Sequence, residues 1–278
     1  MAILFGLASA LSWGAGDFAG GIASRRASAY RATLYGEALG LILLFGAEAV
    51  FPETPMPWQG WVWCCLSGVI GATGLLILYR AMTESQMSLA APISGLAAAA
   101  LPVAAGSLLQ GLPRPVTLLG FVLALLAVWL VSQGQGTSPQ TLTRLAELRL
   151  PLISGVAFGM YFILIHQGSG HGLLWPLIAA RCGGTICLSL YAIFQRELKL
   201  PRLALLPWVM LNAVGDLGGN TFYILAGQIG RMDVAAVLGS LYPGGTVVLA
   251  WLLLREKITR PQFAGILTAL AAIALLTL

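Results

Sequence analysis

The chain has 278 residues, of which 58% are hydrophobic and only 9% are charged. Soluble domains carry about 25% charged residues, so this chain has too few charges to cover a water-facing surface. Its net charge of +5 comes from basic residues scattered between apolar runs. That pattern excludes a nucleic-acid-binding patch and indicates an integral membrane protein.

Long apolar runs follow one another along the chain, separated by prolines and charged residues such as those at 52–55 and 196–199. A membrane-spanning helix needs about 20 mostly apolar residues. We therefore expect ten spans, at residues 2–22, 31–51, 59–80, 87–109, 115–132, 151–168, 173–194, 204–227, 233–254 and 261–278.

The two halves of the chain match at a constant offset of 145 positions. At this offset Ser9 meets Ser154 and Gly74 meets Gly219. Four further identities share it: Gly14 with Gly159, Trp63 with Trp208, Ala81 with Ala226 and Gly120 with Gly265. One gapless offset that also pairs the predicted helices indicates an internal repeat.

Each half holds five predicted helices, and an odd number makes the second half enter the membrane from the opposite side. The sequence therefore predicts an all-α integral membrane protein, with ten transmembrane helices arranged as two five-helix inverted repeats. The repeats would be residues 1–132 and 151–278, joined by a linker at 133–150.

Basic residues fall very unequally on the two sets of predicted loops. One set holds only Arg114 and Arg231. The other holds twelve: Arg25, Arg26, Arg31, Arg80, Arg144, Arg149, Arg196, Lys199, Arg202, Arg255, Lys257 and Arg260. By the positive-inside rule the richer set is cytoplasmic. We expect a multi-pass inner-membrane protein with both termini outside and the 133–150 linker in the cytoplasm.

The predicted eighth helix carries a polar stripe. Asn212, Asp216, Asn220 and Tyr223 lie at i, i+4, i+8 and i+11, on one helical face. Polar groups at bilayer depth face the bundle interior or a water-filled path. The stripe could therefore form interhelical hydrogen bonds or line a substrate cavity.

An aromatic lining is predicted from the first and sixth helices. Trp13 and Asp17 lie four residues apart, and the offset places Phe158 and Phe162 at the matching positions, with Tyr161 nearby. Aromatic rings offer large apolar surfaces and attract cations. Ordinary helix packing is the alternative interpretation. Tyr79 and Tyr242 also lie in central helices and could face the cavity.

Arg181 lies well inside the predicted seventh helix, where an unpaired charge is unfavourable. We expect a carboxylate partner, and Asp216 lies at a similar depth, whereas Asp17 and Glu37 lie nearer the cytoplasmic side. The arginine could be structural, or it could capture a substrate carboxylate. The three carboxylates are also candidates for proton or cation coupling.

His166 lies near the end of the sixth helix and could relay protons, or it could be a hydrogen-bonded packing residue. Proline within a helix removes a backbone hydrogen bond and can form a hinge. The candidate hinges are Pro92, Pro102 and Pro243.

Two motifs carry a family resemblance. Residues 13–18 read Trp-Gly-Ala-Gly-Asp-Phe and are followed by glycines at 20–21 and arginines at 25–26; residues 254–259 read Leu-Arg-Glu-Lys-Ile-Thr and precede Gly265. With the repeat, the chain resembles the drug/metabolite transporter superfamily, and within it the EamA-type ten-helix members. The first repeat departs from the pattern, because Gln110-Gly111 stands where the second has its acidic residue.

The resemblance implies a secondary transporter that exports small metabolites, works by alternating access, and needs no cofactor or metal. It favours amino acids, aromatic ones included, as the substrate; sugars and drugs remain alternatives. The expected partners are a small molecule and the lipid bilayer, with a monomeric chain.

An enzyme is the competing class of function. Residues 14–17 match the GxGD pattern of intramembrane aspartyl proteases. Such a protease needs a second aspartate on the preceding helix, and no predicted helix comes before this one. Zinc-protease, serine-hydrolase and Walker phosphate-loop motifs were not found either, so we expect no enzymatic activity.

Overall fold

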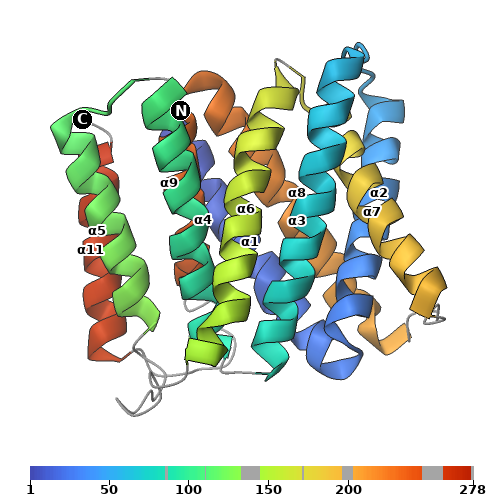
Figure 1. The fold of residues 1–278 in the computed structure, drawn as a ribbon, viewed down its shortest axis with the longest axis horizontal. Helices are drawn as coiled ribbons and strands as arrows, with labels where there is room; N and C mark the ends of the chain where they lie inside the picture. Colours follow the sequence, from blue (N-terminus) through green and yellow to red (C-terminus); the bar gives the residue numbers. More distant parts are fainter. Residues whose placement is uncertain are drawn as a thin grey trace.

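The computed structural model describes residues 1–84, 87–109, 111–132, 145–170, 172–195, 203–245 and 259–276. Within these ranges the chain forms α-helices, one short 3-10 helix and no strand (Figure 1). The elements are α1 (Ala2–Arg26), α2 (Ala29–Val50), α3 (Trp58–Glu84), α4 (Met87–Leu109), α5 (Pro115–Ser132), α6 (Leu145–Ser169), α7 (Leu174–Gln195), η2 (Leu203–Leu205), α8 (Leu206–Ile229), α9 (Met232–Gly239) and α11 (Arg260–Leu276).

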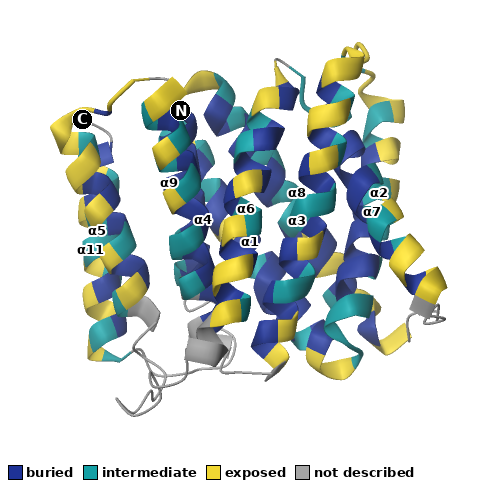
Figure 2. Cartoon of the chain, viewed as in Figure 1, coloured by how far each residue is buried: buried dark blue, intermediate teal, exposed yellow. Residues whose placement is uncertain are grey.

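The outside of the bundle is apolar. Among the described helices, five have the length and composition to cross a bilayer: Ala2–Arg26, Ala29–Val50, Trp58–Thr83, Arg149–Ser169 and Leu174–Phe194. Large side chains such as Ile42 and Phe194 are 68% and 83% exposed, and exposed positions run along the outer helices (Figure 2). Such a surface suits lipid rather than water, as expected of an all-α integral membrane protein.

Both termini lie at the same end of the bundle (Figure 1). The end of α5 and the start of α6 lie at the opposite end. This is the arrangement that five helices in each half require, because each half then crosses the bundle an odd number of times.

The packing of the helices repeats when the two halves are exchanged. The most extensive contacts join α1 to α8 and α3 to α6. Exchange turns one of these pairs into the other, because α1 corresponds to α6 and α3 to α8. The pairs α5–α11 and α2–α7 also pack together, and exchange turns each into itself. The fold is therefore two inverted repeats whose helices interleave.

The same symmetry extends to single hydrogen bonds. The Ser9 hydroxyl donates to the Gly219 carbonyl at 2.8 Å, and the Ser154 hydroxyl donates to the Gly74 carbonyl at 2.9 Å. Both residues of one bond map onto the other bond at the 145-position offset. The repeat found in the sequence therefore corresponds to a repeat in the structure.

Small residues let the helices of different repeats approach closely. A Cβ atom on Gly215 would lie 2.6 Å from the nitrogen and 2.7 Å from the Cα of Gly16. A Cβ atom on Gly68 would overlap the Ala180 carbonyl. Close backbone crossings of this kind are how membrane helices associate without a hydrophobic driving force.

Two helices depart from the predicted spans. α6 begins at Leu145 rather than 151, so Pro151 lies inside it. The predicted span 233–254 is broken: α9 ends at Gly239, and the chain becomes helical again at Tyr242. Pro243 lies just after the break and cannot donate a backbone hydrogen bond.

The other two prolines behave differently. α4 continues from Met87 to Leu109 through Pro92 and Pro102. The side chain of Pro92 lies outside the described part of the chain, while Pro102 is buried in an unbroken helix. The hinge role stays a prediction for all three prolines.

Candidate functional site

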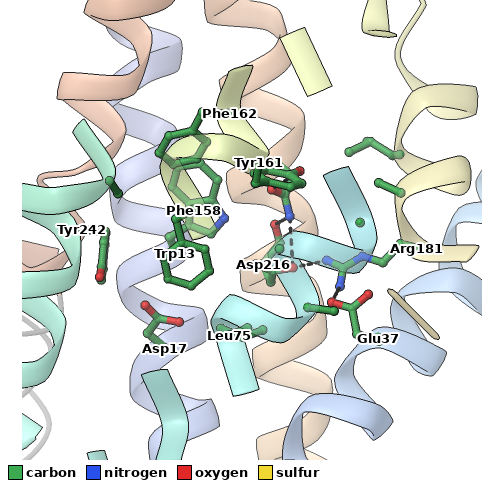
Figure 3. Close-up of a pocket in the computed structure, with 17 residues that line it drawn as sticks. Trp13, Asp17, Glu37, Leu75, Phe158, Tyr161, Phe162, Arg181, Asp216 and Tyr242 are labelled. Carbon is green, nitrogen blue, oxygen red and sulfur yellow. Dashed lines mark hydrogen bonds and ion pairs between the residues drawn. The ribbon is translucent and has the colours of Figure 1, made fainter. Parts of the chain in front are cut away.

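A cavity lies in the middle of the bundle, where helices of the two repeats meet (Figure 3). Its walls come from α1 to α4, from α6 to α8, and from the segment that follows the break after α9. The lining residues are Trp13, Asp17, Glu37, Gly68, Gly71, Ala72, Leu75, Ala98, Phe158, Tyr161, Phe162, Leu177, Ala180, Arg181, Asp216, Asn220 and Tyr242.

One wall of the cavity is aromatic. The Trp13 ring lies 5.4 Å from Phe162, centroid to centroid, and Tyr161 lies 5.8 Å from Phe162. Tyr223 stacks behind at 4.6 Å from Phe162 and 6.0 Å from Trp13. Rings packed against one another hold a rigid apolar surface.

The aromatic wall follows the internal symmetry. A Cβ atom on Gly219 would overlap the Trp13 ring, and one on Gly74 would lie 3.3 Å from the Phe158 ring. Trp13 and Phe158 are matching positions of the two repeats, as are the two glycines. The Trp13 ring therefore packs against Gly219 of α8, and the Phe158 ring packs against Gly74 of α3.

The ionic centre of the cavity, formed by Arg181, Glu37 and Asp216, lies next to the aromatic wall (Figure 3). One guanidinium nitrogen of Arg181 lies 2.5 Å from Glu37 Oε1, and another contacts Asp216 Oδ2. The arginine and glutamate side chains are only 6% and 7% exposed. Two carboxylates thus share one planar guanidinium, a geometry for which arginine is well suited.

Glycines leave room for this ionic centre. A Cβ atom on Gly184 would lie 2.9 Å from Glu37 Oε2, and one on Gly40 would lie 3.3 Å from Arg181 Nε. The charged groups are therefore tightly enclosed, which fixes their positions.

A hydrogen-bonded chain connects the ionic centre to the aromatic wall. The Tyr161 hydroxyl donates to Asn220 Oδ1 at 2.7 Å, and Asn220 Nδ2 donates to Asp216 Oδ2 at 3.0 Å. Asp216 therefore accepts from both Arg181 and Asn220. A ligand that displaced either donor would disturb both walls.

Asp17 lies apart from the ionic centre, on the other side of the rings of Trp13 and Phe158 (Figure 3). It is 8% exposed and accepts a hydrogen bond from the Tyr79 hydroxyl at 3.3 Å. Of the basic side chains in the described ranges, none forms an ion pair with it. Asp17 is therefore a buried carboxylate whose charge calls for a proton or a cation as partner.

Most of the residues that the sequence analysis selected meet in this one cavity. Trp13, Asp17, Glu37, Phe158, Tyr161, Arg181, Asp216, Asn220 and Tyr242 all line it. The expected carboxylate partner of Arg181 is present, and Glu37 joins Asp216 in that role.

Three selected residues lie behind the cavity walls instead. Asn212 donates to the Gly16 carbonyl at 3.0 Å and to the Tyr79 hydroxyl at 2.6 Å. The Tyr223 hydroxyl donates to the Phe162 carbonyl at 3.1 Å. For Asn212, Tyr79 and Tyr223 the structure thus shows interhelical hydrogen bonding.

His166 does not line the cavity either. It is partly buried near the end of α6, and a Cβ atom on Gly227 would lie 3.0 Å from its Nδ1. Its proposed proton-relay role stays a prediction.

The small and aliphatic part of the lining was not predicted from the sequence. Gly68, Gly71, Leu75 and Leu177 line the cavity, yet glycines and leucines are abundant throughout the chain. The spacing of Gly68 and Gly71 on one face of α3 was the available signal.

Comparison with known proteins agrees with this architecture. The family described as "EamA-like transporter family" matches residues 1–133 and 147–278. A solved structure described only as "Crystal structure of protein" superposes with a TM-score of 0.78 at 16% identity, covering 99% of this chain and 96% of that one. At that identity the likeness shows the fold alone.

No curated protein matches the chain. The family match, however, covers both repeats and leaves out only the residues between them. The chain therefore belongs to the EamA-like transporter family, and it is a membrane transporter of small molecules.

Proposed function

We propose that the chain is a secondary transporter that exports amino acids with apolar or aromatic side chains by alternating access. The observation that carries this proposal is the composition of the central cavity. A pair of opposite charges, Arg181 and Asp216, lies beside an aromatic wall. The carboxylate and ammonium groups of an amino acid would bind to the ion pair. Its apolar side chain would bind to the aromatic wall next to that pair.

The charged groups of the substrate would replace existing partners within the ionic centre. The substrate carboxylate would take one side of the Arg181 guanidinium, and the ammonium group would approach the carboxylate thereby released, Asp216 or Glu37. This exchange breaks one ion pair and forms two, so a zwitterionic ligand can enter the site without leaving a buried charge alone. The side chain would lie against Trp13 and Phe162.

The packing supports movement of two interleaved bodies around the cavity. One body consists of α1 and α8 with α9, and the other of α3, α4, α6 and α7; α9 packs on α4 as extensively as on α1 and so also joins the two bodies. α2 contacts both bodies. Each body contains helices of both repeats, and inverted repeats generate two related states by such movement.

Polar contacts join the two bodies at the cavity. They include Tyr79 with Asp17, Tyr79 with Asn212, Tyr161 with Asn220, Tyr223 with the Phe162 carbonyl, and Arg181 with Asp216. Hydrogen bonds and ion pairs can exchange with water or substrate when the bodies separate, whereas the glycine-rich crossings inside each body would remain closed.

Exchange of a cationic compound for protons is a second candidate function. It is favoured by the excess of carboxylates: Asp17, Glu37 and Asp216 line the cavity with the single arginine Arg181. Asp17 lies beside the aromatic wall, where a cation would also contact ring faces.

Flux into proteoliposomes tests both candidates. We would compare labelled phenylalanine and leucine with phenethylamine, which lacks the carboxylate, and 3-phenylpropionate, which lacks the ammonium group. A sugar and a quaternary ammonium compound complete the series, each with and without a pH gradient. We expect saturable flux of both amino acids, with each truncated analogue at least about tenfold slower, because each loses one charged contact.

Arg114→Gln provides the matched control, because Arg114 is exposed and lies outside the cavity. Gradient-driven flux of the quaternary ammonium compound without amino-acid flux would overturn the amino-acid proposal and support the second candidate. Flux of the sugar alone would overturn both.

A further inference from the structure

A second cavity lies at the end of the molecule where α1 leads into α2. Its walls are the α1–α2 turn, the last turns of α3, and the end of α7. The lining residues are Ser24, Arg25, Ser28, Ala29, Tyr30, Leu76, Ile77, Arg80, Thr83 and Tyr191. The central cavity shares none of these residues.

A small apolar cluster separates the two cavities. Leu34, Leu188 and Ala192 are buried together with Ala72, which lines the central cavity. Tyr30 and Leu76, which line the second cavity, also pack against this cluster. Because the cavities share no lining residue and both contact this cluster, we treat the second cavity as a separate site.

The polar part of the second cavity is basic. Arg25 and Arg80 both line it, and no acidic side chain is among the described lining residues. The Ser28 hydroxyl, which accepts a hydrogen bond from the Arg31 backbone at 3.2 Å, keeps its own proton for donation. Two guanidinium groups and a hydroxyl donor suit a phosphate group, whose oxygens accept in pairs from arginine.

The rim of the cavity faces lipid. Tyr30 and Tyr191 lie with ring centroids 5.2 Å apart, and the Tyr30 hydroxyl donates to the Leu188 carbonyl. Tyr191 is 50% exposed, and its neighbours Ile193 and Phe194 are 57% and 83% exposed. Tyrosines gather at the head-group level of a bilayer, and Ile193 and Phe194 lie still nearer the end of α7, so the rim of the cavity lies at the membrane surface.

We propose that this cavity binds the phosphate group of an anionic phospholipid from the leaflet at the α1–α2 end of the molecule. Arg25 and Arg80 hold the phosphate, and Leu76, Ile77 and Tyr191 contact the glycerol and upper acyl region. The lipid then touches α1, α2 and α3 of the first repeat and α7 of the second. Basic pockets between membrane helices on the cytoplasmic side recognise anionic head groups by this chemistry.

Native mass spectrometry of the purified full chain tests the proposal without depending on transport. The probes are dioleoyl-phosphatidylglycerol, dioleoyl-phosphatidylcholine and inorganic phosphate alone, each titrated separately. We expect saturable binding of one phosphatidylglycerol. Arg25→Gln and Arg80→Gln should each weaken it about fivefold, since a surface arginine adds about 1 kcal/mol to anionic-lipid binding.

Two further variants separate this site from a general effect of charge. Arg260→Gln removes an exposed arginine at the start of α11, away from the cavity, and should leave binding unchanged. The double variant Arg25→Lys with Arg80→Lys keeps both charges and should retain most of the binding.

Three outcomes would overturn the proposal. The first is phosphatidylglycerol binding that Arg25→Gln and Arg80→Gln leave intact, and the second is equal binding of phosphatidylcholine. The third is arginine-dependent binding of inorganic phosphate without binding of the lipid, which would assign the cavity to a free anion.

Discussion

Arg181 shows how one residue organises the candidate site. A guanidinium inside a membrane needs charged partners, and this one has two, from α2 and α8. The pair with Asp216 joins the two bodies, and Glu37 adds the helix that contacts both. The same residue therefore links α2, α7 and α8, and it would contact the carboxylate of the proposed substrate.

We expect Arg181→Gln to destabilise the protein by about 3–5 kcal/mol, because it leaves two buried carboxylates without their cation. Thermal unfolding in detergent, followed by tryptophan fluorescence, would measure the change. Arg181→Lys should unfold near the temperature of the parent chain but transport amino acids at least about tenfold more slowly, since a single ammonium lacks the planar fork.

The triple variant Arg181→Gln, Glu37→Gln and Asp216→Asn is the control for that experiment, because it removes all three charges together. It should regain much of the lost stability without regaining flux. Wild-type flux in Arg181→Lys would contradict the substrate role of Arg181 and leave only its structural one.

The role of the Asp17 carboxylate can be tested separately from that of Arg181. An amide can replace its carboxylate and still accept the hydrogen bond from Tyr79, so Asp17→Asn should change the free energy of unfolding by less than about 1.5 kcal/mol. If Asp17 binds a proton or cation in turn, the variant should lose the response of flux to a pH gradient. An unchanged gradient response in proteoliposomes would exclude Asp17 as the coupling group.

Among the helices, glycine residues determine how closely the helix backbones approach at each crossing. α1 and α8 approach so near that Gly215 lies against the backbone of Gly16. Backbone atoms cannot move aside as the end of a flexible side chain can, so this crossing tolerates little added volume.

We expect Gly215→Ala to destabilise the chain by about 1–3 kcal/mol, the usual cost of overpacking a tight contact. Gly46→Ala in α2 is the matched control, because a Cβ atom there would have nothing within 4 Å. That control should be neutral or stabilising by up to about 1 kcal/mol, since alanine is the better helix former. Equal thermal stability of the two variants would show that α1 and α8 separate easily.

The break after α9 is a second feature at this scale. The chain leaves the helix at Gly239 and resumes at Tyr242, whose ring lines the central cavity and whose hydroxyl donates to the Ala91 carbonyl at 2.9 Å. The matching helix of the first repeat, α4, is unbroken. The two repeats therefore share a topology but differ where they meet the cavity, which gives the site its asymmetry.

At the scale of the whole molecule, both termini lie at one end of the bundle (Figure 1). The positive-inside rule predicts that this end faces away from the cytoplasm. We expect a C-terminal fluorescent protein that matures only in the cytoplasm to remain dark, and a C-terminal alkaline phosphatase to be active.

Fusion of the same reporters after Ser132, at the end of α5, is the internal control and should give the reverse pattern. Bright fluorescence from the C-terminal fusion would reverse the orientation of the entire molecule. It would also place the second cavity in the outer leaflet.

The membrane-embedded character, the helical class and the internal repeat could be predicted from the amino-acid sequence alone. These follow from hydropathy and from a gapless offset, which are properties of residues close together in the chain or at a fixed spacing. The pairing of Ser9 with Ser154 was predicted this way, and both serines make the same hydrogen bond in the structure. The aromatic and charged candidates stood out for the same reason, because they are rare in apolar spans.

Which of these candidates lie together could be learned only from the folded chain. The rotation of each helix about its axis and its depth in the bundle depend on contacts between distant segments. Spacing therefore placed Asn212 and Asp216 on one face of α8 but could not show that Asp216 reaches the cavity while Asn212 bonds to α1 and α3. For the same reason Glu37, expected nearer the cytoplasmic side, could not be identified as the second partner of Arg181 until the crossing of α2 and α7 was known.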